Sequence, residues 1–150
     1  MLLQKIQEQL IVAMKAHKII EVGTIRMLIS AIKNLAIDKY GVDAETKVLD
    51  ADVLEVVKKQ VKTHKESIEA FTKAGRTELS DKEKEELDVL AKYLPKELSD
   101  DELRKIVSKV VSESSELEFG PLMGKVMTAV KGQADGNRVS FILKELRSFK

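Results

Sequence analysis

Apolar residues recur at intervals of three and four positions along most of this chain, and no segment shows the strict alternation of an amphipathic strand. The longest series covers about five helical turns and consists of Leu54, Val57, Val61, His64, Ile68 and Phe71. A seam of this kind is typical of a helix that packs against other helices. The spacing therefore predicts an all-α fold.

Glycines and capping residues divide this pattern into about seven helices. Gly41 and Gly75 are expected to end the second and third helices, and residues 41–47 are expected to form a loop. Ser80 and Ser99 are each followed by a glutamate three positions later. This spacing predicts a capping box at the start of the fourth helix and another at the start of the fifth.

The chain is expected to form two parts that meet at Pro95. Proline disfavours helical geometry in the residue before it, so the fourth helix should end near Leu94. We predict an N-terminal helical subdomain over residues 1–94, in which three longer helices are followed by a connecting helix. We predict a C-terminal three-helix bundle over residues 95–150.

The composition narrows the classes of function. Lys and Arg number 26 and Asp and Glu number 25, so the chain as a whole is not suited to indiscriminate binding of nucleic acid. Residues 119–150 nevertheless hold six basic and two acidic side chains, and this segment favours an anionic partner. The most apolar region, residues 19–37, contains Glu21, Arg26 and Lys33, which argues against a membrane span. With no cysteine either, we expect a soluble, cytoplasmic protein.

Residues suited to catalysis or metal binding are few. His17 and His64 lie 47 positions apart. Because His64 falls in the apolar seam, we expect it to be a core residue whose hydrogen bonds are satisfied within the protein. No carboxylate pattern converges on either histidine, so no metal site and no cofactor are expected. These observations predict that the chain is not an enzyme on its own.

The last two helices are expected to meet at a tight corner. Pro121 lies just inside the start of one helix, Gly132 lies just past its end, and Asp135 marks the start of the next. Glycine permits close approach of the backbone to a ligand, so Gly132 is a candidate contact for phosphate. Two structural roles remain open: Gly132 could simply cap a helix, and Gly124 could let two helices pack closely.

Five cations accompany this corner. Lys125, Lys131 and Arg138 lie on or beside it, and Lys144 or Arg147 would extend the same patch along the final helix. Phosphate groups bind where cationic side chains and accessible backbone coincide. We predict that these five residues, together with Gly132, contact RNA.

Several segments also carry a family resemblance that covers nearly the whole chain. The chain resembles the YqeY-like family at Arg26 to Asp38 (RMLISAIKNLAID), at Ala74-Gly75-Arg76, at Tyr93-Leu94-Pro95, at Met123 to Met127, and at Lys131 to Gly136. That family is similar to the C-terminal tail domain of the B subunit of tRNA-dependent glutamyl/aspartyl amidotransferases. The resemblance implies a helical N-terminal part, a C-terminal three-helix bundle and an association with tRNA.

Three functions follow as hypotheses. The first is a non-catalytic helical module that binds tRNA or other structured RNA through its terminal bundle. The second is a protein-interaction adaptor for a tRNA-handling enzyme, which would hold a partner helix in an apolar groove. The third, implied by the resemblance alone, is an accessory role in carbon–nitrogen ligation with glutamine as the amido donor.

Overall fold

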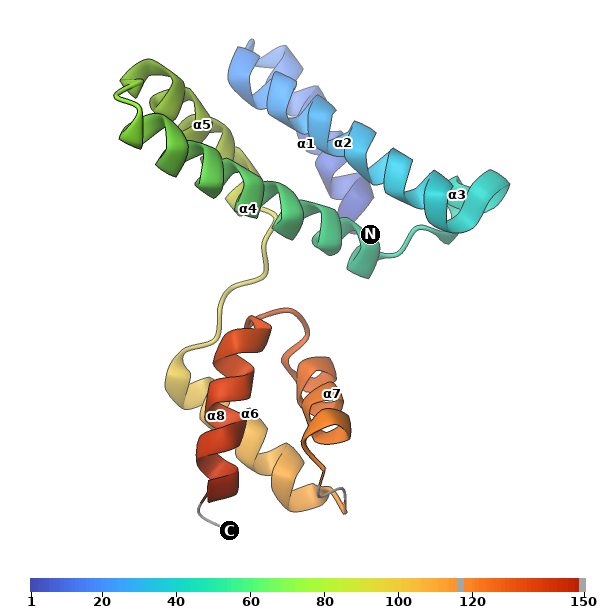
Figure 1. The fold of residues 1–150 in the computed structure, drawn as a ribbon. Coiled ribbons are helices and arrows are strands. Elements are labelled where there is room, and N and C mark those ends of the chain that lie inside the picture. The colour runs from blue at the N-terminus through green and yellow to red at the C-terminus, as the bar shows by residue number, and fades with distance from the viewer. Residues whose placement is uncertain (116–117, 149–150) are drawn as a thin grey trace. The chain divides into compact units, whose positions relative to one another are not determined.

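The computed structural model describes residues 1–115 and 118–148, and within them helices are the regular structure, with no strand (Figure 1). The all-α class is thereby confirmed. The seven longer helices are α1 (Leu2–Lys15), α2 (Ile19–Tyr40), α4 (Asp50–Lys73), α5 (Thr77–Ala91), α6 (Asp100–Glu113), α7 (Phe119–Val130) and α8 (Gly136–Ser148). Between α2 and α4 lie a 3-10 turn (Gly41–Asp43) and the single-turn α3 (Ala44–Lys47).

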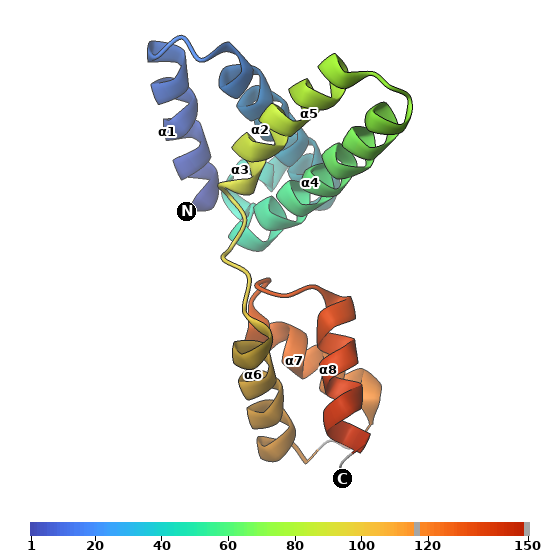
Figure 2. The ribbon, with the colours of Figure 1, turned by 90° about the vertical axis from the view of Figure 1, so that its left-hand side faces the viewer.

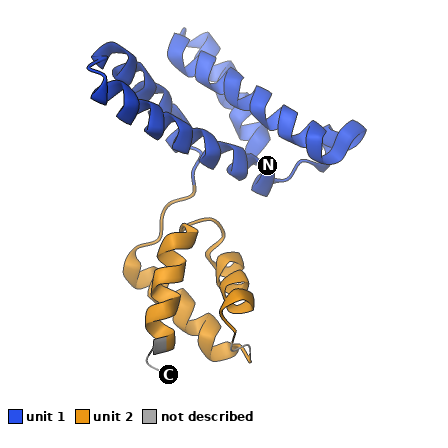
Figure 3. Cartoon of the chain, in the orientation of Figure 1, with its two compact units in different colours: residues 1–94 blue, residues 95–150 orange. Residues whose placement is uncertain are grey.

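The chain divides into two compact units, which we call the N-terminal unit (Met1–Leu94) and the C-terminal unit (Pro95–Lys150) (Figure 3). Each unit has a hydrophobic core of its own. Burying one large aliphatic side chain contributes about 1.5–3 kcal/mol, so each core provides its unit with a separate source of stability.

The N-terminal unit consists of two helical pairs (Figures 1 and 2). Helix α1 packs against α2, α4 packs against α5, and α2 contacts both members of the second pair. The fully buried side chains of this core include Ile6, Ile25, Leu28, Ile32, Val57 and Leu90. Because Leu90 belongs to α5, the fourth long helix is part of this core, and the expectation of a connecting helix was wrong.

The predicted start of α5 was also wrong. The helix begins at Thr77, two residues after Gly75, whose φ of +70° reverses the chain within a short turn. Ser80 is therefore inside the helix, 2% exposed, with its hydroxyl 3.0 Å from the hydroxyl of Thr72 on α4. Because a buried hydroxyl requires a partner, this contact with α4 replaces the capping role that the sequence suggested.

Residues 41–47 are more ordered than the predicted loop. The 3-10 turn and α3 occupy this segment, and Ala44 and the following Val48 are buried in the core of the N-terminal unit. Two apolar side chains that face the core hold the segment in a turn of helix. The loop prediction missed them because four residues are too few to show a helical period.

Asp52 is the most buried charged residue of the N-terminal unit, with 1% of its surface exposed. Its carboxylate accepts hydrogen bonds from the ammonium group of Lys39, from the hydroxyl of Tyr40 at 2.8 Å and from the backbone N–H of Leu49 at 2.9 Å. The Lys39 hydrogen bond and then the Leu49 N–H lower the pKa of Asp52. This carboxylate therefore joins the end of α2 to the start of α4.

The C-terminal unit is a bundle of α6, α7 and α8. The predicted capping box of α6 is confirmed: the Ser99 hydroxyl accepts a hydrogen bond from the Glu102 N–H at 3.2 Å, and the Glu102 carboxylate accepts one from the Ser99 N–H at 2.9 Å. The fully buried side chains of the bundle include Leu103, Val107, Val126, Val130, Val139 and Leu143. These residues come from all three helices, so the core is shared by the whole bundle.

Candidate nucleic-acid interface

The corner between α7 and α8, residues 131–135, is fixed by its backbone. Lys131 and Gly132 are consecutive left-handed residues, with φ values of +49° and +78°, and they turn the chain where α7 ends. The carbonyl of Gln133 accepts a hydrogen bond from the N–H of Leu98, 2.9 Å away, just before α6. The Asp135 carboxylate accepts the N–H of Arg138 at 2.8 Å and so caps α8. The predicted helix end at Gly132 and helix start at Asp135 are both confirmed.

Lys131 presents its side chain to solvent at this corner. Its ammonium group forms no ion pair or hydrogen bond with any residue that the structure describes. The left-handed backbone at Lys131 costs conformational energy, about 1–2 kcal/mol for a residue other than glycine. The corner therefore holds a cationic side chain outward at a strained position, next to a glycine.

Arg138 lies at the same end of the bundle but is held by its neighbours. Its Nη2 atom donates to the carbonyl oxygen of Leu98 and to the carboxylate of Asp100, each at 2.8 Å. The Asp100 hydrogen bond is the main cause of the raised pKa of Arg138. Both bonds come from one nitrogen, and the donors on the other two nitrogens have no partner among the described residues. The guanidinium is thus oriented and retains donors for a ligand.

The other three predicted cations lie toward the opposite end of the bundle. Lys125 donates a hydrogen bond to the hydroxyl of Ser114, which follows α6, at 2.9 Å. The ammonium of Lys144 and the guanidinium carbon of Arg147 lie 5.6 and 5.8 Å from the centroid of the Phe119 ring. At these distances a cation is attracted to the face of an aromatic ring.

The predicted residues therefore fall into two groups. The corner group consists of Lys131, Gly132 and Arg138, and the Phe119 group consists of Lys125, Lys144 and Arg147. Lys144 and Arg147 meet at the Phe119 ring, whereas the contact of Lys125 is with Ser114.

Phe141 is a candidate that the sequence analysis did not single out. Its side chain is 65% exposed, and it borders a hollow of 400 Å³ together with Asp100, Arg104, Asn137, Arg138 and Ile142. Arg104 is itself oriented by an ion pair with Glu145 at 3.0 Å. An exposed aromatic ring that borders the same hollow as two arginines can stack on a nucleic-acid base while the arginines contact phosphate.

A signal for Phe141 was present in the sequence. The apolar face of α8 is formed by Val139, Ile142, Leu143 and Leu146, and Phe141 lies off that face. It follows Asn137 and Arg138 by four and three positions, so it shares their side of the helix. Phe141 can therefore be identified from the sequence as a large apolar residue on the polar face of a helix.

The outer face of α7 is open. Gly120 and Gly124 lie on it, and a Cβ atom added to either would meet no described atom within 4 Å beyond its chain neighbours and the backbone of its own helix. Thr128 is exposed one turn further along. The alternative that Gly124 allows two helices of this chain to pack closely is therefore wrong.

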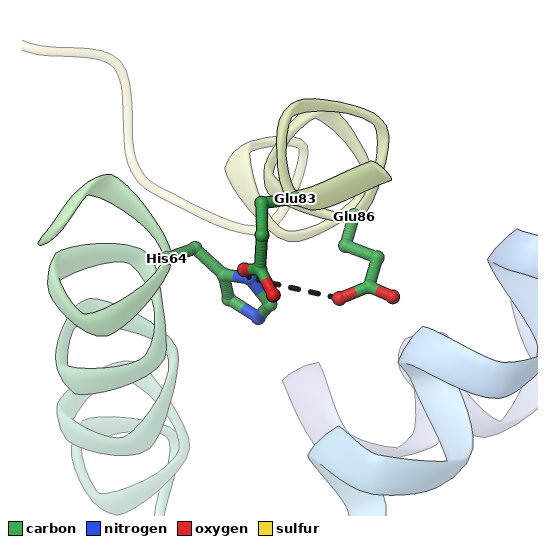
Figure 4. A group of neighbouring side chains, drawn as sticks. All are labelled: His64, Glu83 and Glu86. Atoms are coloured by element: carbon green, nitrogen blue, oxygen red, sulfur yellow. Dashed lines mark hydrogen bonds and ion pairs between the residues drawn. The ribbon is translucent and has the colours of Figure 1, made fainter. Parts of the chain in front are cut away.

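In the N-terminal unit the structure brings two carboxylates to one histidine (Figure 4). The Nδ1 atom of His64 on α4 pairs with the Glu83 carboxylate and lies 3.7 Å from that of Glu86, both on α5. One ligand atom from each residue lies within 4.8 Å of those of the other two. The expectation that no carboxylate converges on a histidine was wrong, because these residues are far apart in the sequence and meet only when α4 and α5 pair.

No helix in the described part of the chain combines the length and the apolar character that crossing a bilayer requires.

Comparison with known proteins gives a match along nearly the entire chain. A family model described as Yqey-like protein matches residues 3–146. A protein of Pyrenophora tritici-repentis named "Altered inheritance of mitochondria protein 41, mitochondrial" is 30% identical over 96% of this chain and 80% of its own length. An uncharacterized protein of Schizosaccharomyces pombe is 31% identical over 63% of this chain and 72% of its own length.

Proposed function

The chain belongs to the YqeY-like protein family, and from the surface of its C-terminal unit we propose that it is a non-catalytic module that binds structured RNA, tRNA foremost. One observation carries this proposal. The exposed ring of Phe141 stands beside two oriented arginines, Arg104 and Arg138, at the border of a hollow.

Proteins recognise RNA mainly where bases are unstacked and can lie on an aromatic side chain or a guanidinium plane. Phe141 offers the aromatic face, and the remaining donors of Arg138 offer contacts to phosphate or to a base edge. Lys131 and Gly132 add a cation and accessible backbone near the start of α8. The corner group and Phe141 together form the proposed site.

The proposal predicts that tRNA binding depends on the aromatic ring. Stacking of one base is worth about 1–3 kcal/mol, so Phe141→Leu should weaken binding of the full chain about tenfold. Fluorescence anisotropy with labelled tRNA measures this affinity. Phe71→Leu, in the N-terminal unit, is the matched control and should leave the affinity unchanged.

Contacts with phosphate also predict how the affinity for tRNA depends on the salt concentration. The logarithm of the affinity should fall linearly with the logarithm of the salt concentration, and Lys131→Ala should reduce the slope by about one. An affinity for tRNA that does not change with the salt concentration would overturn the proposal. The same affinity for tRNA in the wild type, Phe141→Leu and Phe71→Leu would also overturn it. Competition with unrelated structured RNA then distinguishes a preference for tRNA from binding of structured RNA in general.

The adaptor hypothesis is favoured by a different observation, the open face of α7. A glycine inside a helix costs about 1 kcal/mol relative to alanine, and nothing within the described chain makes use of the space at Gly124. A partner helix that approaches this face would use it. Pull-down after nuclease treatment separates the two hypotheses, because an association bridged by RNA disappears and a direct one survives.

The remaining expectations belong to the same proposal. Any carbon–nitrogen ligase chemistry with glutamine as the amido donor would reside in a partner enzyme, and this chain would act beside it. The cytoplasm is the expected compartment, whereas the name of the Pyrenophora relative refers to mitochondria for that protein. Fractionation of cells with an antibody against this chain decides between the two compartments.

A further inference from the structure

The cluster of His64, Glu83 and Glu86 lies in the N-terminal unit, in a groove that α2, α4 and α5 line together. Glu83 and Glu86 are three positions apart on α5, so both side chains project from one face of that helix, and both carboxyl groups lie beside the His64 ring (Figure 4). Their side chains are 23% and 19% exposed, and that of His64 is 19% exposed. The cluster is therefore half-buried, and the groove that it lines has a volume of 790 Å³.

The charges of this cluster do not balance. The other charged residues that line the groove are Asp38 and Glu55 against Lys39 and Lys59, and Lys39 is already paired with Asp52. Two glutamates thus face one imidazole, which carries at most a single positive charge. The Nδ1 atom can donate one proton, and it pairs with Glu83. Glu86, at 3.7 Å, accepts no hydrogen bond from any described residue.

We propose that this cluster is a binding site for a divalent transition-metal ion, with Zn²⁺ as the reference ion. One imidazole nitrogen and two carboxylate oxygens form a donor set that zinc accepts, and a dication would neutralise both glutamates. Zinc–ligand distances near 2.1 Å place tetrahedral ligands about 3.4 Å apart. The present ligand atoms lie within 4.8 Å of one another, so the side chains would have to move closer together to bind the ion.

Three protein ligands leave the fourth tetrahedral position for water or another small molecule. Neutral polar side chains line the same groove, namely Gln60, Thr63 and Ser67 on α4 and Asn34 on α2. These groups can hydrogen-bond to metal-bound water or to a ligand that replaces it. A bound ion would also tie α4 to α5.

The test is a calorimetric titration of the chelator-treated full chain with Zn²⁺ alone. We expect one ion per chain, and His64→Ala and Glu83→Gln should each weaken binding by at least about tenfold, because one protein ligand is lost. The matched controls are His17→Ala, which removes the other histidine, and Glu85→Gln, which alters an exposed glutamate on the same helix. Both should bind Zn²⁺ like the wild type.

A spectroscopic readout keeps the proposal testable if a variant folds poorly. Co²⁺ added to the wild-type chain should give visible absorption bands typical of a tetrahedral or five-coordinate site, and equimolar Zn²⁺ should remove them. Equal zinc affinity in the wild type and in a folded His64→Ala variant would overturn the proposal. So would a loss of affinity in His17→Ala. The cluster would then be an ion pair between two helices and nothing more.

Discussion

At the scale of single residues, the clearest consequence concerns Asp52. Its buried carboxylate accepts hydrogen bonds from Lys39, from Tyr40 and from the backbone N–H of Leu49. Asp52→Ala would leave the Tyr40 hydroxyl and the Leu49 N–H without this partner, and we expect the free energy of unfolding to fall by about 2 kcal/mol. Urea denaturation followed by tyrosine fluorescence measures the change.

An exposed ion pair provides the control for that substitution. Asp43 pairs with Lys47 at 2.8 Å, and both side chains are more than half exposed. Exposed pairs contribute about 0–1 kcal/mol. Asp43→Ala should therefore change the stability much less than Asp52→Ala. Equal effects of the two substitutions would show that the buried carboxylate has no special role.

The same carboxylate predicts a dependence on pH. The pKa of Asp52 is lowered in the folded state, so the unfolded chain binds this proton more readily. The stabilisation is present above the ordinary aspartate pKa of about 4 and is lost as the pH falls through the lower folded value. Asp52→Asn should therefore show a smaller loss of stability between pH 5 and pH 2 than the wild type, measured by urea denaturation at each pH.

At the scale of elements, Gly124 inside α7 and Gly132 at the corner should respond in opposite ways to alanine. Gly124 lies within α7 with open space beside it, so Gly124→Ala should stabilise the C-terminal unit by about 0.5–1 kcal/mol. Gly132 has a φ of +78°, so Gly132→Ala should destabilise the unit by about 1 kcal/mol or more. Denaturation followed by circular dichroism compares them. A destabilising Gly124→Ala would mean that α7 has no free outer face.

The helix ends that could be predicted from the sequence are those set by local chemistry. Ser99 and Glu102 form their capping box with each other, so four consecutive residues contain the whole signal. Ser80 and Glu83 have the same spacing, but in the structure they face Thr72 and His64 on α4. Their partners come from another helix, and no local pattern distinguishes the two cases.

In the candidate sites, too, features set by neighbouring residues could be predicted, and features set by contacts between helices could not. The turn at Lys131 and Gly132 could be predicted from the glycine and the flanking helical periods, and the structure confirms it. The cluster of His64 and the two glutamates could not, because His64 and Glu83 are 19 positions apart and meet only when two helices pair. The meeting of Lys144 and Arg147 at the Phe119 ring likewise depends on how α7 and α8 pack together.

At the scale of the whole molecule, the two units should unfold as separate cooperative steps. Tyr40 and Tyr93 are the only tyrosines, there is no tryptophan, and both tyrosines belong to the N-terminal unit. Tyrosine fluorescence therefore reports on that unit, whereas circular dichroism at 222 nm reports on helices in both. We expect the two unfolding curves to differ, since coincidence is the mark of a single transition.

Two substitutions test which unfolding transition belongs to which unit. Asp52→Ala should shift the fluorescence curve, and Ser99→Ala, which removes the α6 cap at a cost of about 1 kcal/mol, should shift only the remaining part of the circular dichroism curve. Coincident curves that both substitutions move together would show that the chain unfolds as one unit.

The central claim is that the C-terminal unit binds structured RNA through the corner group and Phe141. The most direct measurement is a ¹⁵N-labelled NMR titration of the full chain with tRNA, which at 16.8 kDa gives a resolved amide signal for most residues. We expect chemical-shift changes that begin at Lys131, Gly132, Arg138 and Phe141, while the signals of residues 1–94 stay in place at the first additions. Changes confined to the N-terminal unit, or none at tRNA concentrations that exceed ordinary non-specific affinities, would contradict it.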